Sequence, residues 1–379
     1  ILIGRGLIHS NDPLPPCISS FQGMNVNENL VSFSQRERGG VFCVLSGNSM
    51  GTSVSTNLYF KNKKVCNIMI PITGKWGDDM RVLDSYVELG IVGMARAGKT
   101  SWPLGHVGAA LLAGYFMNQE HELPEHVKEG IERTCEAFRR QHPEWFAPPE
   151  PEEADPVLLE WIIKGIADNV KQLRTSGHGL ALGVLALKAL RQRPDLITPQ
   201  IVDGLAAMLE GTTKDRPNRY WGIENYFEVT AADVPDIPAY QDTLDMTRRT
   251  FSELHTVVPG RVIDGVMYHL AGETIHSITH AQALTDLERF GYDDLVSTGM
   301  VNHRIQMHLN RQIPDFVLED EVKEPVFVSL YDPQYWAKTF TDPHALKFPY
   351  AALDLLKRLP ETERAEAERN ACKLLTIIP

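Results

Sequence analysis

The sequence is poor in the features that mark several protein classes. Cysteine is scarce, and its number is odd. The chain has 379 residues and five cysteines, at Cys17, Cys43, Cys66, Cys135 and Cys372. Their spacing shows no Cys-x-x-Cys pair for a metal and no disulfide framework. This usage fits a reducing compartment, so we expect a cytoplasmic protein.

Basic clusters and long apolar runs are also missing. The formal net charge is −12, with 37 lysines and arginines against 49 aspartates and glutamates. Such a composition does not suit nucleic acid, whose protein partners concentrate lysine and arginine. The longest apolar runs, over 107–117 and 179–187, are shorter than the roughly 20 residues of a membrane-spanning helix. We therefore expect a small-molecule substrate, with neither nucleic acid nor a membrane as partner. The sequence does not set the oligomeric state.

One stretch matches the phosphate-loop pattern, but its surroundings do not fit. Residues 93–100 are Gly-Met-Ala-Arg-Ala-Gly-Lys-Thr. A phosphate loop needs a buried strand before it and a helix directly after its lysine. Here the preceding segment has helical periodicity, and Trp102-Pro103 interrupts any helix that would start at Lys99. We interpret the match as chance at the end of a helix, with Gly98 as its C-cap, and nucleotide binding as the less favoured alternative. The sequence also has no Gly-x-Gly-x-x-Gly loop after a strand and no Gly-x-Ser-x-Gly elbow.

The first 68 residues differ from the rest of the chain. They carry three of the five cysteines, many serines, asparagines and glycines, and only short strand-like patches, over 40–45 and 54–60. Met69 stands just before the periodic sequence begins. Our hypothesis is that residues 1–68 are an irregular segment outside the native protein, translated from an upstream region. A small β-rich appendage is the equally weighted alternative. Residues 69–379 then form the helical domain.

From Asp79 onward, apolar residues recur at helical spacing. The periodicity predicts amphipathic helices over 106–118, 125–139, 157–173, 198–209, 242–254, 262–270, 294–309 and 361–375, with others that open at the histidines described next. A Pro/Glu-rich connection over 143–156 and irregular stretches over 211–240 and 314–333 separate some of them. The predicted fold class is mainly all-α, with an irregular, β-poor N-terminal segment. The helices would form a bundle of helical hairpins or an incomplete α/α toroid.

Histidines recur at the starts of these helices. His106, His178, His280 and His344 each follow a turn signal and precede an apolar run. His276 and His280 are four residues apart, so they share one face of a helix. A single histidine near a helix start is usually a packing or capping residue, but four comparable placements favour a shared site. We expect the helix ends at His106, His178 and His280 to converge. A metal is not favoured, because no Glu-x-x-His pair and no third histidine at regular spacing accompanies His276 and His280.

The order of these motifs resembles that of the questin oxidase-like family. The matching segments are His106 with Ala109-Ala-Leu-Leu-Ala, His178-Gly-Leu-Ala-Leu-Gly-Val, Ile275-His-Ser-Ile-Thr-His-Ala-Gln-Ala-Leu284 and Pro343-His-Ala-Leu-Lys-Phe-Pro-Tyr-Ala-Ala-Leu353. Family members carry Asn-His-x-x-Met-Ala-Leu, His-Gly-x-Ile, His-x-x-Thr-x-x-x-Ala-Leu and His-x-x-Lys motifs. The resemblance spans residues 100–356. It departs from the family at Gly105, where asparagine is usual, and at Val107-Gly108-Ala109, which replaces an apolar-Pro-Met run.

The resemblance implies an oxidoreductase that inserts oxygen beside a ketone of a polycyclic aromatic substrate. Such a Baeyer–Villiger-type monooxygenase uses NADPH. The implied catalytic site is a central apolar pocket lined by His106, His178, His276, Thr279 and His280. One imidazole would act as general base on a phenol, while Thr279 or a second imidazole holds the oxyanion. Because the chain has no Rossmann fingerprint, NADPH would bind by other means or serve a partner reductase.

Two other classes of function stay open. A helical-toroid hydrolase or lyase would use the same pocket but normally needs a pair of acids, and no such pair stands near the histidines. A non-catalytic helical scaffold would use the histidines only to cap helices. The centre of the fold discriminates between these classes, because an enzyme needs a chamber reached by several imidazoles and a scaffold does not.

Overall fold

The chain divides into two compact units, Ile1–Met80 and Arg81–Pro379, which we treat separately as the N-terminal unit and the helical unit. In this computed structural model, side chains are described for residues 84–215, 225–254, 273–311, 329–375 and 378. The backbone is also described for residues 82–83 and 270–272 and for short strands elsewhere in the chain.

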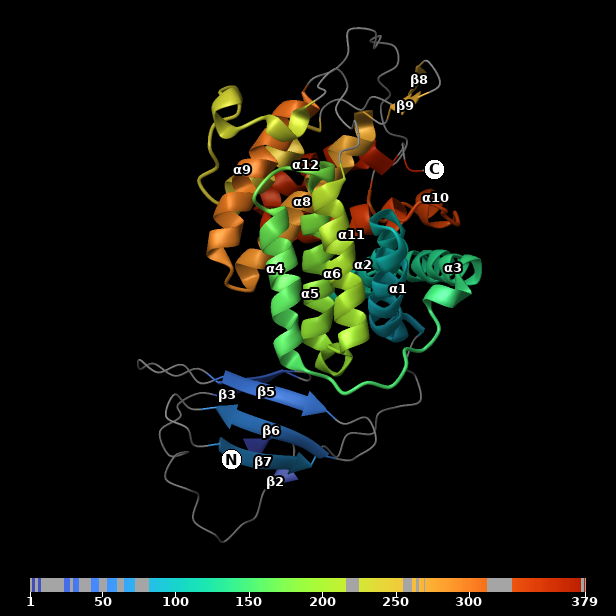
Figure 1. Cartoon of the computed structure of the whole chain (residues 1–379), viewed down its shortest axis with the longest axis vertical. Coiled ribbons are helices and arrows are strands. Elements are labelled where there is room, and N and C mark those ends of the chain that lie inside the picture. The colour runs from blue at the N-terminus through green and yellow to red at the C-terminus, as the bar shows by residue number, and fades with distance from the viewer. Residues whose placement is uncertain are drawn as a thin grey trace. The chain divides into compact units, whose positions relative to one another are not determined.

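The N-terminal unit contains short antiparallel strands (Figure 1). They are β1 (Leu2–Ile3) paired with β2 (Gly6–Leu7), β3 (Met24–Asn27) paired with β4 (Leu30–Phe33), and a sheet in the order β5 (Phe42–Gly47), β6 (Ser53–Tyr59) and β7 (Val65–Pro71). β5 and β6 overlap the two strand-like patches of the sequence. That residues 1–68 lie outside the native protein stays a prediction.

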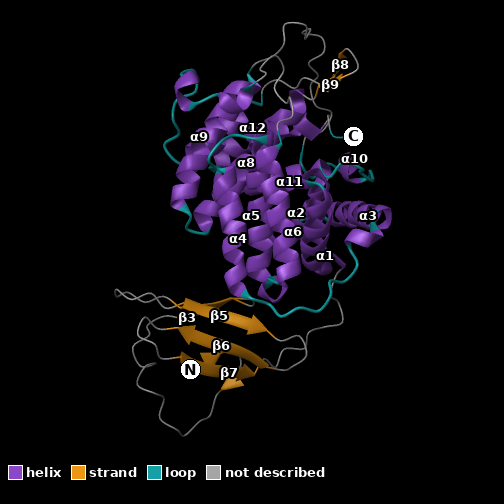
Figure 2. Cartoon of the chain, viewed as in Figure 1, coloured by secondary structure: helices purple, strands orange, loops and turns teal. Residues whose placement is uncertain are grey.

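The helical unit confirms the predicted all-α fold class (Figure 2). Its longer helices are α1 (Tyr86–Thr100), α2 (Gly105–Glu120), α3 (Glu125–Gln141), α4 (Leu159–Asn169), α5 (His178–Gln192), α6 (Pro199–Lys214), α7 (Thr243–Ser252), α8 (Leu270–Arg289), α9 (Asp293–Asn310), α11 (His344–Arg358) and α12 (Glu361–Leu375). The short helix α10 covers Pro333–Trp336. A helix predicted over 262–270 is wrong, because β8 (Arg261–Ile263) and β9 (Val266–Tyr268) form a hairpin there. The sequence signals of this hairpin are the β-branched residues in both strands and the Asp-Gly dipeptide between them, and the helical periodicity obscured both.

Four helices form the centre of the helical unit. α2 contacts α5, α5 contacts α8, α8 contacts α11, and α11 contacts α2. Other helices pack outside them: α1 and α3 on α2, α4 and α6 on α5, α7 and α9 on α8, and α12 on α11. Small residues let these helices approach closely. A Cβ on Gly108 of α2, for example, would lie 2.2 Å from the backbone nitrogen of Met94 in α1.

The central helices meet at two polar levels. At one level the rings of His106, His178, His276 and His344 are neighbours. At the other, a set that we call the lysine network is joined by hydrogen bonds and ion pairs: Glu120, Lys188, Gln282, Asp286, Arg289, Tyr350 and Asp354. Each helix contributes its histidine earlier in the sequence than its network residues, so the four helices run in the same direction.

The phosphate-loop-like stretch lies inside α1, which continues through Thr100. Its last turn is capped at Ser101, so the expectation that Gly98 caps the helix is wrong. Gly98 instead permits close packing of α1 on α6, because a Cβ there would lie 2.8 Å from the side chain of Met208. No phosphate-binding loop precedes Lys99, since that residue is still helical.

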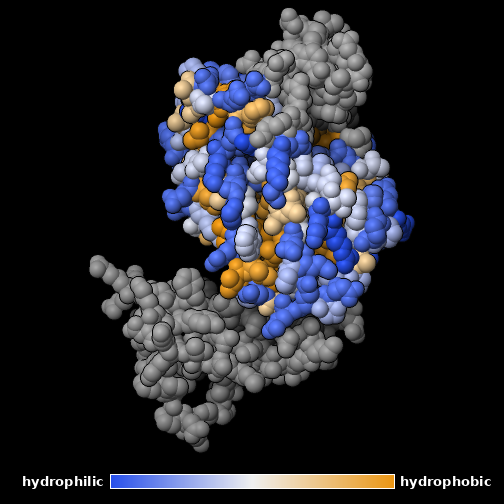
Figure 3. Space-filling view, in the orientation of Figure 1, coloured by the Kyte–Doolittle hydropathy of each residue, from blue (hydrophilic) through white to orange (hydrophobic). Residues whose placement is uncertain are grey.

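The face of the helical unit in Figure 3 is mainly hydrophilic, with apolar residues between polar ones. Large exposed apolar side chains among the described residues are Val157, Trp161 and Val301. Within the described residues, no helix combines the length and the apolar character that crossing a membrane requires.

Candidate functional site

Four buried or half-buried imidazoles from four helices meet at the centre of the helical unit. We call His106 (α2), His178 (α5), His276 (α8) and His344 (α11) the histidine cluster. Ring centroids are 4.7 Å apart for His106 and His178, 4.1 Å for His178 and His276, and 5.1 Å for His276 and His344. The centroid of His344 lies 5.3 Å from that of His106, which closes the ring.

The cluster contains three of the five predicted site residues, His106, His178 and His276. The other two lie outside it. His280 is one turn further along α8, where its Nδ1 lies 2.8 Å from Oε1 of Gln306. Thr279 donates its hydroxyl to the carbonyl of His276 at 3.2 Å, a bond within the helix. The expectation that three helix ends converge therefore holds for α2 and α5, but α8 contributes His276 in place of His280.

Two carboxylates orient two of the clustered imidazoles. His276 donates from Nδ1 to Oε2 of Glu273 at 3.3 Å, and His344 donates from Nδ1 to Oδ1 of Asp342 at 2.7 Å. The neutral form of each ring then carries its lone pair on Nε2. These two Nε2 atoms face each other at 3.1 Å. Two lone pairs at that distance repel, so the geometry requires a proton or a metal cation between them.

The remaining imidazoles differ in their partners. Nδ1 of His178 bonds to the backbone carbonyl of Thr175, which fixes the orientation of the ring. Nδ1 of His106 is buried and has no hydrogen-bond partner among the described residues. Trp102 lies against both rings, with centroids 5.7 Å from His106 and 5.2 Å from His178. Its indole donates to Asp215 at 2.6 Å, so the aromatic wall of the cluster is itself held in place.

Two of the clustered imidazoles, His106 and His344, favour the neutral form. Burial, and then the charge of Lys347, lowers the pKa of His106 well below its ordinary value. The same two causes lower the pKa of His344, while Asp342 opposes them. Burial also lowers the pKa of the Lys347 amine to about 7, against the opposing charge of Asp342. At neutral pH His106 and His344 therefore offer uncharged nitrogen donors beside an amine that exchanges its proton readily.

These donors match the requirements of a transition metal. Metal–imidazole bonds of about 2.0–2.1 Å place neighbouring nitrogens roughly 3 Å apart, as His276 and His344 are. Ligand nitrogens of His106, His178 and His344 lie within 4.8 Å of one another. Carboxylates behind ligating histidines are the usual outer-shell partners of such a centre. Regular spacing in the sequence does not indicate this metal group, because its donors His106, His178 and His344 come from α2, α5 and α11, and His276 of α8 joins them through His344.

A second group with metal-ligand chemistry is less suited to a cation. Glu120, His121 and Asp354 have ligand atoms within 4.8 Å of one another. Lys188 already pairs with Glu120 at 2.7 Å, however, and Arg289 pairs with Asp354 at 2.9 Å. A metal ion would have to displace these cations, so we assign no metal to this group.

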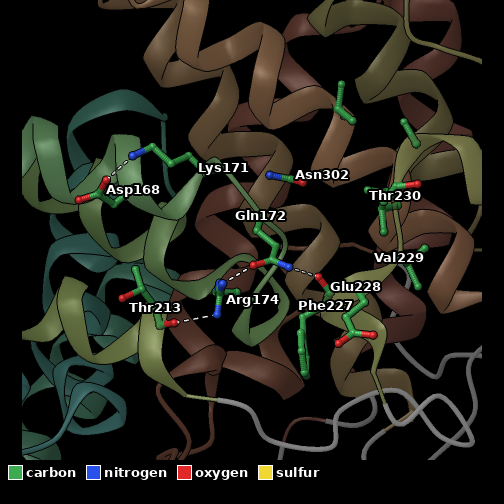
Figure 4. Close-up of a pocket in the computed structure, with 13 residues that line it drawn as sticks. Asp168, Lys171, Gln172, Arg174, Thr213, Phe227, Glu228, Val229, Thr230 and Asn302 are labelled. Atoms are coloured by element: carbon green, nitrogen blue, oxygen red, sulfur yellow. Dashed lines mark hydrogen bonds and ion pairs between the residues drawn. The ribbon is translucent and has the colours of Figure 1, made fainter.

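An open pocket of about 620 Å³ lies beside the segment that leads into α5. Figure 4 shows that Gln172 joins two sides of this pocket, with bonds to Arg174 and to the backbone carbonyl of Phe227. Arg174 also donates to the carbonyl of Thr213 at 2.9 Å. No histidine of the cluster lines this pocket. Two of its polar residues, Gln172 and Arg174, anchor the chain just before His178.

Several residues of the site were missed by sequence reasoning. The sequence patterns place His344 at a helix start but do not predict that it joins the other histidines, and they give no role to Glu273, Asp342, Lys347 or Trp102. Asp342-Pro343-His344 and the lysine three residues later were the available signals.

Comparison of the chain with family models, with curated proteins and with solved structures finds no match.

Proposed function

We propose that the chain is an oxidoreductase whose active centre is the histidine cluster. Its substrate would be a polycyclic aromatic compound or ketone into which oxygen is inserted. The observation that carries this proposal is the 3.1 Å approach of Nε2 of His276 to Nε2 of His344, with a carboxylate behind each ring. Four imidazoles that converge from parallel helices support an enzyme centre over a scaffold, in which each histidine would only need its own partner. A chamber at the cluster, which an enzyme needs, is part of the proposal.

A divalent transition metal is part of this proposal. His106, His178, His276 and His344 would hold the ion, while Glu273 and Asp342 fix the ring orientations. Imidazole donors suit iron, copper, nickel and zinc. A redox-active ion bound there would pass electrons from the reductant to O2 and would supply the orbitals that the reaction of oxygen with an organic substrate requires.

The protein's own groups would prepare the substrate. The amine of Lys347, with its pKa lowered to about 7 by burial, can take a proton from a phenolic substrate near neutral pH. Trp102 offers an aromatic face beside the cluster. In the overall reaction one atom of O2 enters the substrate beside its carbonyl, and the other leaves as water with two electrons from NADPH. The reductant would reach the site without a Rossmann domain or through a partner reductase.

Metal analysis and oxygen uptake test this proposal. The purified chain should hold about one iron or copper ion and consume O2 with NADPH and a hydroxylated polycyclic quinone or ketone. His276→Ala and His344→Ala should lose both the ion and the turnover. His142→Ala is the matched control, because its ring stacks on Trp145 outside the cluster. Wild-type metal content and turnover in both cluster variants would reject the site. Zinc alone, with hydrolysis of an ester or lactone, would instead support the hydrolase alternative.

A further inference from the structure

The turn that leads into α5 has an unusual backbone. Thr175, Ser176 and Gly177 have φ angles of 46°, 55° and 81°, all in the left-handed region. Residues with a Cβ rarely adopt this conformation, so Thr175 and Ser176 need outside contacts to stay there. The turn ends at His178, whose Nδ1 bonds back to the carbonyl of Thr175. The path of the turn therefore sets where the imidazole of His178 points.

Partners from other elements hold this turn. The carbonyl of Ser176 accepts a hydrogen bond from Nε2 of Gln306 in α9 at 3.0 Å, and its hydroxyl donates to Glu273 of α8. The backbone N–H of Thr175 donates to the hydroxyl of Tyr226 at 3.2 Å. These bonds come from both sides of the turn and compensate for its left-handed path.

His280 completes this support. Its Nδ1 bonds to Oε1 of Gln306 at 2.8 Å, so Gln306 joins His280 to the carbonyl of Ser176. The ring also lies against Gly177, where a Cβ would be 2.7 Å from Nδ1 of His280. On another side His280 packs on His303, at a centroid distance of 5.3 Å. His280 is 3% exposed, and its contacts with Gln306 and Gly177 are with groups that shape the turn.

We propose that His280 is a positioning residue: together with Gln306 it holds the left-handed turn Thr175–Gly177 and thereby aims His178 at the cluster. The inference rests on the proposed function, in which His178 is a metal ligand. His280, which the resemblance implies is catalytic, then acts only through the position of His178.

Titration of the metal-free protein with Co²⁺, followed by visible absorption, tests this role. His280→Leu and Gln306→Leu should weaken Co²⁺ binding by about 10- to 100-fold, the usual effect of losing an outer-shell partner. His280→Asn should bind Co²⁺ almost as well as the wild type, because an asparagine amide can replace Nδ1 in the bond to Gln306. Gln306→Glu, which keeps the shape but loses the donor to Ser176, should behave like Gln306→Leu. The thermal midpoint of each metal-free variant shows that the fold is retained.

Two results would overturn the inference. Wild-type Co²⁺ affinity in His280→Leu and in both Gln306 variants would show that the turn needs neither residue. Loss of Co²⁺ binding in His280→Asn as complete as in His280→Leu, with thermal midpoints unchanged, would make the imidazole itself essential. If the wild-type chain binds no Co²⁺, the proposed metal fails, and hydrogen exchange of residues 172–178 decides the inference alone. Faster exchange in His280→Leu than in His280→Asn supports the positioning role, and equal exchange contradicts it.

Discussion

The histidine cluster and the lysine network lie on the same four helices but differ in how completely their polar groups are satisfied. Lys188, Asp286 and Asp354 each follow a cluster histidine by ten residues, so the two levels are separated by about 15 Å along the helices. In the lysine network Lys188 lies 2.7 Å from Glu120 and 2.6 Å from the hydroxyl of Tyr350. Arg289 pairs with both aspartates, at 2.8 and 2.9 Å.

The histidine cluster is incomplete by comparison. Nδ1 of His106 has no partner in the described part of the chain, and burial lowers the pKa of the neighbouring Lys347 amine to about 7. The 3.1 Å contact between Nε2 of His276 and Nε2 of His344 also needs a proton or a cation between the two atoms. Buried polar groups without partners are costly. The polar groups of the lysine network therefore satisfy one another, whereas the histidine cluster has donor nitrogens that can bind a further cation.

The largest expected effect is on the lysine network. Lys188→Met should lower the free energy of unfolding by about 3–5 kcal/mol, because Glu120 would lose its cation and Asp286 one of its two. Urea denaturation followed by circular dichroism measures this change. Lys164→Met, which removes an exposed pair with Asp168, is the control and should cost less than about 1 kcal/mol. Equal losses in the two variants would contradict a structural role for the network.

The second prediction tests whether the histidine cluster binds a metal. Asp342→Asn should weaken metal binding about 10- to 100-fold, because the carboxylate orients His344 through Nδ1. Stability of the metal-free protein should change far less. Competition with a chelating dye measures the affinity, and Asp195→Asn, a surface change, is the control. An unchanged affinity in Asp342→Asn would show that His344 is not a ligand.

The third prediction concerns acid. Burial lowers the pKa of His303 to about 3 and of His280 to about 4, with His280 contributing to the shift of His303. In the unfolded chain both imidazoles take up a proton as the pH falls below about 6.5, whereas in the folded chain they stay neutral. The contribution of both histidines to the free energy of unfolding is therefore complete above about pH 6.5 and is lost as the pH drops toward about 3. Each histidine contributes up to about 1.4 kcal/mol per pH unit. Urea denaturation at pH 7, 6 and 5 should show a shallower loss in His303→Asn than in the wild type. Parallel slopes would contradict neutral burial of His303.

The smallest effect has the opposite sign to the first. Lys347→Met should raise the free energy of unfolding by about 1 kcal/mol, because the cost of burying this amine exceeds the attraction of Asp342. Turnover should fall in the same variant if the amine takes a substrate proton. A lysine-to-methionine change is thus expected to stabilise the protein at the histidine cluster, in Lys347→Met, and to destabilise it at the lysine network, in Lys188→Met. A loss of stability in Lys347→Met comparable to that in Lys188→Met would break the comparison.

The sequence predicted much of the fold and three of the four histidines of the cluster. Helical periodicity identified the helices, and repeated turn–histidine–apolar patterns located His106 and His178 at helix starts. It could not decide between His276 and His280, because residues four apart share one helix face and only the packing of α8 against its neighbours sets which reaches the centre. The left-handed turn at Thr175–Gly177 was also beyond reach, since its partners Gln306 and Tyr226 are distant in the sequence.

One measurement tests the central claim most directly. A crystal of the protein grown with Fe²⁺ or Co²⁺, with data collected at the absorption edge of the metal, locates the ion by its anomalous signal. The account predicts one strong peak within bonding distance of nitrogens from His106, His178, His276 and His344. Full occupancy of the metal elsewhere in the chain, with His276 and His344 joined only by a hydrogen bond, would contradict it.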